Sequence, residues 1–208
     1  MQGDDEGTTV PVWDPLVRIG HWLIVAAFFT AYIGGEEFPG KHVLAGYVLA
    51  GVLLLRIAWG FVGSRHARFS DFLRSPAATL RYLRDMLGRR ERRYLGHNPA
   101  GAAMIVALIL SISVTGAAGL MTYAIKGEKG PLAGWVAPAV EPVQPDGSKG
   151  RDPRVRFWKE VHEVGGKLAL LLVVLHVGGV LYASRSHREN LVKAMLTGRK
   201  RAADPADD

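Results

Sequence analysis

The sequence predicts an all-α fold, an integral membrane four-helix bundle, and two observations carry this prediction. Hydrophobic residues make up 49% of the 208-residue chain and gather in blocks. A helix needs ~20 apolar residues to cross ~30 Å of hydrocarbon. Four blocks approach that length, and the basic residues concentrate between them. We therefore predict membrane-spanning helices at about residues 16–35, 42–63, 99–123 and 158–183.

The chain is predicted to begin with a polar leader, residues 1–15, followed by the first span. This span follows acidic residues, contains Arg18 and His21, and lacks a small-residue cleavage site. A secretory signal peptide begins with basic residues and ends in such a site, so we expect a helix that stays in the membrane. Pro39 and Gly40 mark a short turn before the second span, which predicts a tight antiparallel hairpin.

A basic segment, residues 64–98, separates the second span from the third. Its apolar residues recur at helical spacing, which predicts an amphipathic helix or a pair of them on the membrane surface. Asn98 and Pro99 fit an N-cap followed by proline at the first helical position, so they should open the third span. A proline-rich loop, residues 124–157, precedes the fourth span, and residues 184–208 form a basic tail.

Charge and cysteine content restrict the location and the cofactor class. The net charge is +7, but the basic residues lie between spans, where orientation signals belong, and do not indicate nucleic-acid binding. Segment 64–98 and the tail should be cytoplasmic, which places both termini in the cytoplasm and loop 124–157 on the opposite side of the membrane. The chain has no cysteine, which excludes disulfides, cysteine-bound iron–sulfur clusters and covalent c-type haem.

Four of the seven histidines lie in or at the ends of the predicted spans. An ionisable side chain in a span is costly, so His21, His42, His162 and His176 are each functional candidates. Because the spans alternate in direction, His42 and His162 should lie near the outer face, and His21 and His176 near the inner face. The α-helix rises ~1.5 Å per residue and has ~3.6 residues per turn, so the two histidines of the fourth span are ~21 Å apart along the helix and share one face.

These matched depths predict two haem groups. Low-spin haem iron accepts two axial imidazoles from opposite sides, and two facing helices can supply them. We expect His42 and His162 to ligate one non-covalent haem b, and His21 and His176 another. For each histidine alone, an inter-helix hydrogen bond is an alternative role. For all four together, the alternative is a protein without haem that transports metal ions or protons, or that serves as a membrane anchor. Transport would require carboxylates inside the spans, and the spans contain almost none.

Three further residues are candidates for binding a haem propionate or quinone. Arg56 lies in the second span near the depth of the inner haem, and guanidinium binds carboxylates in a bidentate manner. Arg18 lies in the first turn of the first span, and snorkelling to the interface is the alternative for both arginines. His97, before the third span, is a candidate to line a quinone pocket. Like His66 and His187, it has the alternative of facing solvent or headgroups.

Several short motifs, taken in order, resemble a known family. They are Arg18-Ile-Gly-His-Trp22, His42, Arg56, Trp59-Gly60, Tyr94-Leu-Gly-His-Asn-Pro99, Trp158-Lys-Glu-Val-His162 and His176. Over about residues 12–200, their order and spacing resemble the bacterial cytochrome b561 and nickel–iron hydrogenase cytochrome b family. The resemblance implies a four-helix core in a bacterial inner membrane, with loop 124–157 in the periplasm. It also implies two haem b groups with bis-histidine ligation by the four histidines above, and electron exchange between the quinone pool and a periplasmic redox partner.

The expected function is therefore electron transfer across the membrane, which requires no catalytic acid, base or nucleophile. The expected partners are membrane quinone and a periplasmic hydrogenase, cytochrome c or other dehydrogenase subunit. The sequence is also compatible with an oligomer of this chain. The Gly-His-Asn-Pro segment is more similar to the hydrogenase-type branch of the family than to the shortest stand-alone b561 proteins. The chain is compact, however, whereas hydrogenase b subunits usually have larger additions outside the membrane.

Overall fold

The computed structural model describes residues 8–35, 37–127, 130–140, 150 and 152–202. The start of the predicted leader, Glu36, parts of loop 124–157 and the end of the tail lie outside the described residues. Two compact units make up the chain, Met1–Ala107 with Val173–Asp208, and Leu108–Leu172, and each is described by itself.

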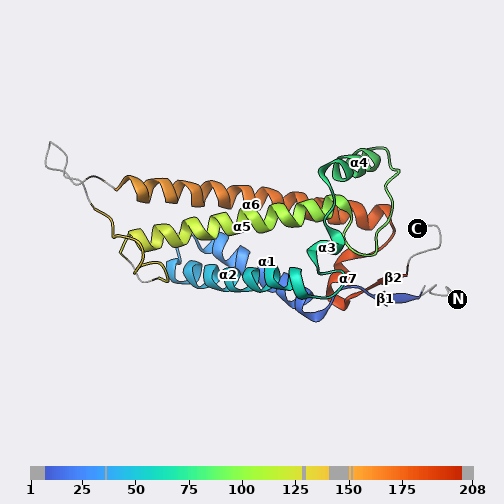
Figure 1. Cartoon of the computed structure of the whole chain (residues 1–208), viewed down its shortest axis with the longest axis horizontal. Coiled ribbons are helices and arrows are strands. Elements are labelled where there is room, and N and C mark those ends of the chain that lie inside the picture. The colour runs from blue at the N-terminus through green and yellow to red at the C-terminus, as the bar shows by residue number, and fades with distance from the viewer. Residues whose placement is uncertain (1–7, 36, 128–129, 141–149, 151, 203–208) are drawn as a thin grey trace. The chain divides into compact units, whose positions relative to one another are not determined.

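Among the described residues, four helices are long and apolar enough to cross a membrane (Figure 1). The predicted fold class, an all-α membrane protein with four spans, is confirmed. Large apolar side chains on these helices are exposed, among them Leu54 and Leu181, which suits surfaces that face lipid. The four helices are α1 (Pro15–Gly34), α2 (Pro39–Val62), α5 (Pro99–Ile125) and α6 (Pro153–Ser186).

Proline at the first helical position and a side-chain cap set most helix starts. Asp14 caps α1 by accepting a hydrogen bond from the Val17 N–H, and Asn98 accepts one from the Gly101 N–H at 2.7 Å, as predicted for α5. Helix α6 starts at Pro153 rather than near residue 158. The apolar block marks the part that suits the membrane, whereas Asp152, which accepts from the Arg154 N–H at 2.8 Å, marks where the helix begins.

In the first unit, α1 and α2 pack against each other. The basic segment holds two helices, α3 (Phe69–Phe72) and α4 (Pro76–Leu87), each of which buries one aromatic residue, Phe72 or Tyr82. The hydroxyl of Tyr182 on α6 donates to the Met86 carbonyl at 2.9 Å, and this bond ties α4 to the end of the fourth span.

A small sheet joins the leader to the tail, which the sequence analysis did not predict. Strand β1 (Thr9–Pro11) pairs antiparallel with β2 (Arg199–Arg201), which follows α7 (Leu191–Thr197). Gly198, between α7 and β2, has φ +81°, and its carbonyl accepts hydrogen bonds from the N–H groups of Val12 and Trp13. An added Cβ there would lie 2.6 Å from the Trp13 carbonyl oxygen, so the junction requires glycine.

Candidate functional site

The cap of α1 also fixes the start of that helix against α2. The Asp14 carboxylate accepts hydrogen bonds from the Trp59 indole N–H at 3.0 Å and from the Ser64 hydroxyl. Burial alone would raise the pKa of this carboxyl, but the hydrogen bonds from Ser64, Val17 and Trp59 lower it overall. Asp14 therefore stays ionised near neutral pH and holds α1 in register with the end of α2.

The structure brings His21 and His176 together within the first unit. His21 projects from α1 and His176 from α6, and their ring centroids are 6.5 Å apart with an interplanar angle of 54°. The Nδ1 of His21 is buried and has no hydrogen-bond partner among the described residues. An unsatisfied buried polar atom is costly, so this pair of rings is incomplete without a further binding partner.

His42 lies in the first turn of α2, and its ring reaches across the hairpin to α1. Its Nδ1 lies 2.8 Å from the carbonyl oxygen of Ala31. A carbonyl oxygen only accepts hydrogen bonds, so in a neutral ring Nδ1 carries the proton. The lone pair of the imidazole is then on Nε2, which is the nitrogen that a metal would bind.

His162 makes the equivalent bond within the second unit. Its Nδ1 lies 2.8 Å from the carbonyl oxygen of Thr115 on α5, which assigns the same tautomer to this ring. Two glycines permit the close approach of α5 and α6. A Cβ added to Gly119 would lie 2.9 Å from the His162 Nδ1, and one added to Gly165 would clash with the Thr115 hydroxyl oxygen.

The two candidate arginines contact protein groups outside the spans. The Arg56 guanidinium donates to the carbonyl of Ala67 at 3.3 Å and lies over the Phe69 ring, with its carbon 5.7 Å from the centroid. Arg18 donates to the carbonyl of Leu196 at the end of α7, while its Nε is buried without a partner among the described residues. These contacts hold α2 to the basic segment and α1 to the tail.

His97 is packed between two aromatic rings rather than facing solvent. Its centroid lies 4.5 Å from that of Trp13 and 4.7 Å from that of Phe72. Burial lowers the pKa of His97 to about 3, and the charges of Arg56 and Lys200 act in the same direction, so the ring is neutral at physiological pH. Its Nδ1 is buried without a partner among the described residues.

A pocket of about 190 Å³ adjoins His97. His66 also lines it, although the sequence offered no sign that these two histidines meet. A Cβ on Gly96 would lie 3.0 Å from the His66 Nδ1, so glycine at this position leaves room for the ring. The remaining lining side chains are Arg65, Asp71, Phe72, Arg74 and Tyr94.

Comparison with known proteins finds a family profile and several relatives that match most of the chain. The family profile described as prokaryotic cytochrome b561 matches residues 12–198. A probable Ni/Fe-hydrogenase B-type cytochrome subunit of Bradyrhizobium diazoefficiens is 26% identical, over 94% of this chain and 87% of its own length. The protein of the same name from Azotobacter vinelandii is 27% identical over 97% and 92%.

A shorter match covers part of the chain. The probable Ni/Fe-hydrogenase 1 B-type cytochrome subunit of Escherichia coli is 30% identical over 54% of this chain and 60% of its own length. No solved structure matches the chain.

Proposed function

Because the chain belongs to the prokaryotic cytochrome b561 family, we propose that it is a membrane di-haem cytochrome b that transfers electrons across the bilayer between a redox partner and the quinone pool. A b-type cytochrome holds haem without covalent attachment, which agrees with a sequence that lacks cysteine. Haem b supplies one-electron transfer at its iron. The protein's task is then to hold the cofactors, exclude water and orient the ligands.

The observation that carries this proposal is the facing pair of His21 and His176. Two imidazoles bound to opposite sides of one metal, each through a bond of about 2 Å, have ring centres roughly 6 Å apart. The 6.5 Å between the two ring centroids lies close to that separation. Within the described residues, no hydrogen bond at the buried Nδ1 of His21 would have to break for this ring to bind a metal.

His42 and His162 are proposed to hold the second haem. In both rings Nδ1 donates to a backbone carbonyl, of Ala31 or of Thr115. A ligating histidine commonly makes this bond with its other nitrogen, because it fixes the tautomer and the ring orientation and raises the basicity of the ligand. The two side chains are thus prepared for metal ligation by hydrogen bonds of 2.8 Å, although they lie in separate units.

Arg56 and Arg18 are proposed to bind haem propionates. Each guanidinium donates to a carbonyl through one nitrogen, and Arg18 has a buried Nε without a partner among the described residues. A guanidinium has five N–H donors, so a carboxylate can join the existing contact.

The pocket beside His97 is proposed as the quinone site. The neutral ring has Nδ1 without a partner among the described residues, and a quinone carbonyl would accept a hydrogen bond from it. Phe72 offers an apolar surface for the quinone ring, and Arg65 and Arg74 at the pocket provide polar contacts. This role needs the basic segment to lie at the cytoplasmic face, with both termini there, as the distribution of arginines favours.

The redox partner is proposed to be a hydrogenase. The support comes from the relatives, which are named as probable Ni/Fe-hydrogenase cytochrome subunits and match over most of both chains. A periplasmic cytochrome c or another dehydrogenase subunit would use the same two haem positions.

The test is to replace each proposed ligand by alanine and to count haem per chain. His21→Ala and His176→Ala should remove the same haem, with the same spectral component lost, while His42→Ala and His162→Ala should remove the other. His187→Ala is the control and should keep both haems. If the His21 and His176 variants lost different spectral components, the proposed pairing would be wrong.

A further inference from the structure

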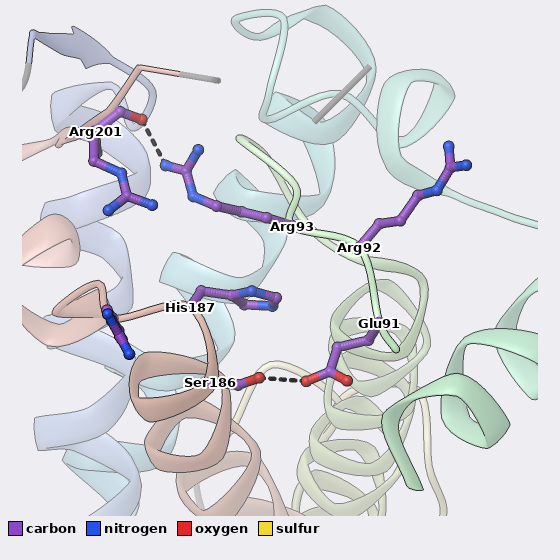
Figure 2. A pocket seen from close by; sticks show the side chains of 7 residues that line it. Glu91, Arg92, Arg93, Ser186, His187 and Arg201 are labelled. Atoms are coloured by element: carbon purple, nitrogen blue, oxygen red, sulfur yellow. Dashed lines mark hydrogen bonds between the residues drawn. The ribbon is translucent and has the colours of Figure 1, made fainter. Parts of the chain in front are cut away.

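A second pocket, distinct from the histidine sites, lies beside the end of α6 and is the subject of Figure 2. Its volume is about 500 Å³, large enough for a small ligand or a headgroup. Segments distant in the sequence form it: the chain before α5, the end of α6 and strand β2. Four arginines line it, namely Arg92, Arg93, Arg188 and Arg201.

The pocket has one carboxylate in its lining, and that group is engaged by neutral donors. Glu91 accepts a hydrogen bond from the Ser186 hydroxyl at 2.5 Å, drawn in Figure 2. The Tyr182 hydroxyl oxygen lies 3.1 Å from the same carboxylate, and its one proton is shared between Glu91 and the Met86 carbonyl. Glu91 therefore offsets one of the four positive charges. His187 adds none near neutral pH, because burial lowers its pKa. The lining carries a net charge of about +3, counted from four arginines and one glutamate.

The arginines differ in how they are held. Arg93 is buried and fixed, since it donates to the Glu189 carboxylate at 2.9 Å and to the Arg201 carbonyl at 2.6 Å. Within the described residues, the side chains of Arg188 and Arg201 have neither a hydrogen bond nor an ion pair. Both guanidinium groups can therefore bind an anion without breaking a hydrogen bond or an ion pair within the described residues. Arg92 points away from Arg93 in Figure 2 and lies at the margin.

The position of the pocket indicates where that anion comes from. Ser186 is the last residue of α6, a helix apolar enough to cross a membrane, and it lines the pocket. The end of a spanning helix lies at the level of lipid headgroups, where phosphate is the abundant anion. Guanidinium matches phosphate geometrically, with two parallel N–H donors, so Arg188 and Arg201 have the chemistry to bind it.

We propose that this pocket binds a phosphate group, and that an anionic phospholipid headgroup at the membrane surface supplies it. This inference is independent of the haem assignment, because no haem-ligand candidate lines the pocket. A bound headgroup would bridge the end of α6 to β2, and thus tie the tail to the fourth span.

Native mass spectrometry of the detergent-purified full chain, titrated with phosphatidylglycerol, tests the proposal. The variant is Arg188→Gln with Arg201→Gln, and the matched control is Arg90→Gln with Arg185→Gln, two exposed arginines that do not line the pocket. The first pair should bind the lipid at least about tenfold more weakly, as expected when charged hydrogen bonds are lost, and the control should stay within about twofold. Equal thermal midpoints for both variants show that the fold is kept.

Competition with inorganic phosphate at constant ionic strength separates the two sources of the anion. If millimolar phosphate displaces the lipid from the wild-type chain but not from the Arg188/Arg201 variant, the pocket accepts the phosphate group alone. If phosphate does not compete, the rest of the headgroup contributes to binding, and the lipid is the ligand. Equal lipid affinity in wild type and both variants, or an equal loss in both variants, would overturn the proposal.

Discussion

Gly119→Ala provides a sharp test of the His162 site. A Cβ at residue 119 would lie 2.9 Å from the His162 Nδ1 and 3.0 Å from its Cε1, whereas ordinary contacts begin near 3.4 Å. The ring must therefore retreat by about 0.5 Å, the difference between the two distances. That shift stretches the 2.8 Å hydrogen bond to the Thr115 carbonyl and moves the proposed ligand away from its metal.

Losing an outer hydrogen bond of a metal ligand typically lowers metal affinity about 10–100-fold. We expect Gly119→Ala to retain about half of the wild-type haem, or to shift the potential of one of the two haems. The assays are a pyridine haemochrome count and a redox titration of the purified protein. Gly116→Ala, one turn earlier on α5, is the control, because an added Cβ there meets nothing within 4 Å.

Alanine favours helix over glycine by about 1 kcal/mol, so neither change should weaken α5 itself. The two variants differ only in what the new methyl group meets. If Gly119→Ala bound as much haem as Gly116→Ala, with the same potentials and spectra, the assignment of His162 as a ligand oriented by Thr115 would be refuted.

Three further predictions follow from other contacts. Arg56→Leu should shift the potential of the haem proposed at His21, because a guanidinium near a propionate stabilises its charge; an unchanged redox titration would count against that contact. Glu189→Gln should lower the thermal midpoint by several degrees, since it leaves two nearly buried cations, Arg93 and Lys200, without their carboxylate. The control, Glu163→Gln, removes one partner of an exposed ion pair and should leave the thermal midpoint unchanged. Burial raises the pKa of Glu189, but Arg93 and Lys200 lower it overall. The ionised Glu189 carboxylate should therefore stabilise the fold above about pH 4, and this stabilisation should be lost as the pH falls through the lower folded pKa. Acid-induced unfolding measures the effect, and a midpoint pH unchanged by Glu189→Gln would contradict it.

The spans could be predicted from the sequence because each is a continuous apolar block, and lipid requires nothing more specific than length and hydrophobicity. The start of α5 was predictable too, since Asn98 and Pro99 are a local signal. The early start of α6 at Pro153 and the β1–β2 pairing were not. Strands of three residues show no alternation, and their pairing joins the two ends of the chain.

For the candidate site, depth along each helix predicted that His21 and His176 could meet, and their rings do lie together. The carbonyl partners of the other two histidines could not be predicted, because every residue has a carbonyl and only the helix packing selects one. The environment of His97 also escaped prediction. Trp13 and Phe72 are distant in the sequence, and their convergence on this ring depends on tertiary structure.

The most direct test of the central claim is a visible spectrum of the detergent-purified protein, oxidised and dithionite-reduced, with a pyridine haemochrome count. The account predicts a split or broad b-type α band and two haem b groups per chain. A colourless protein from haem-replete cells would contradict it and would favour transport of metal ions or protons through the same histidines.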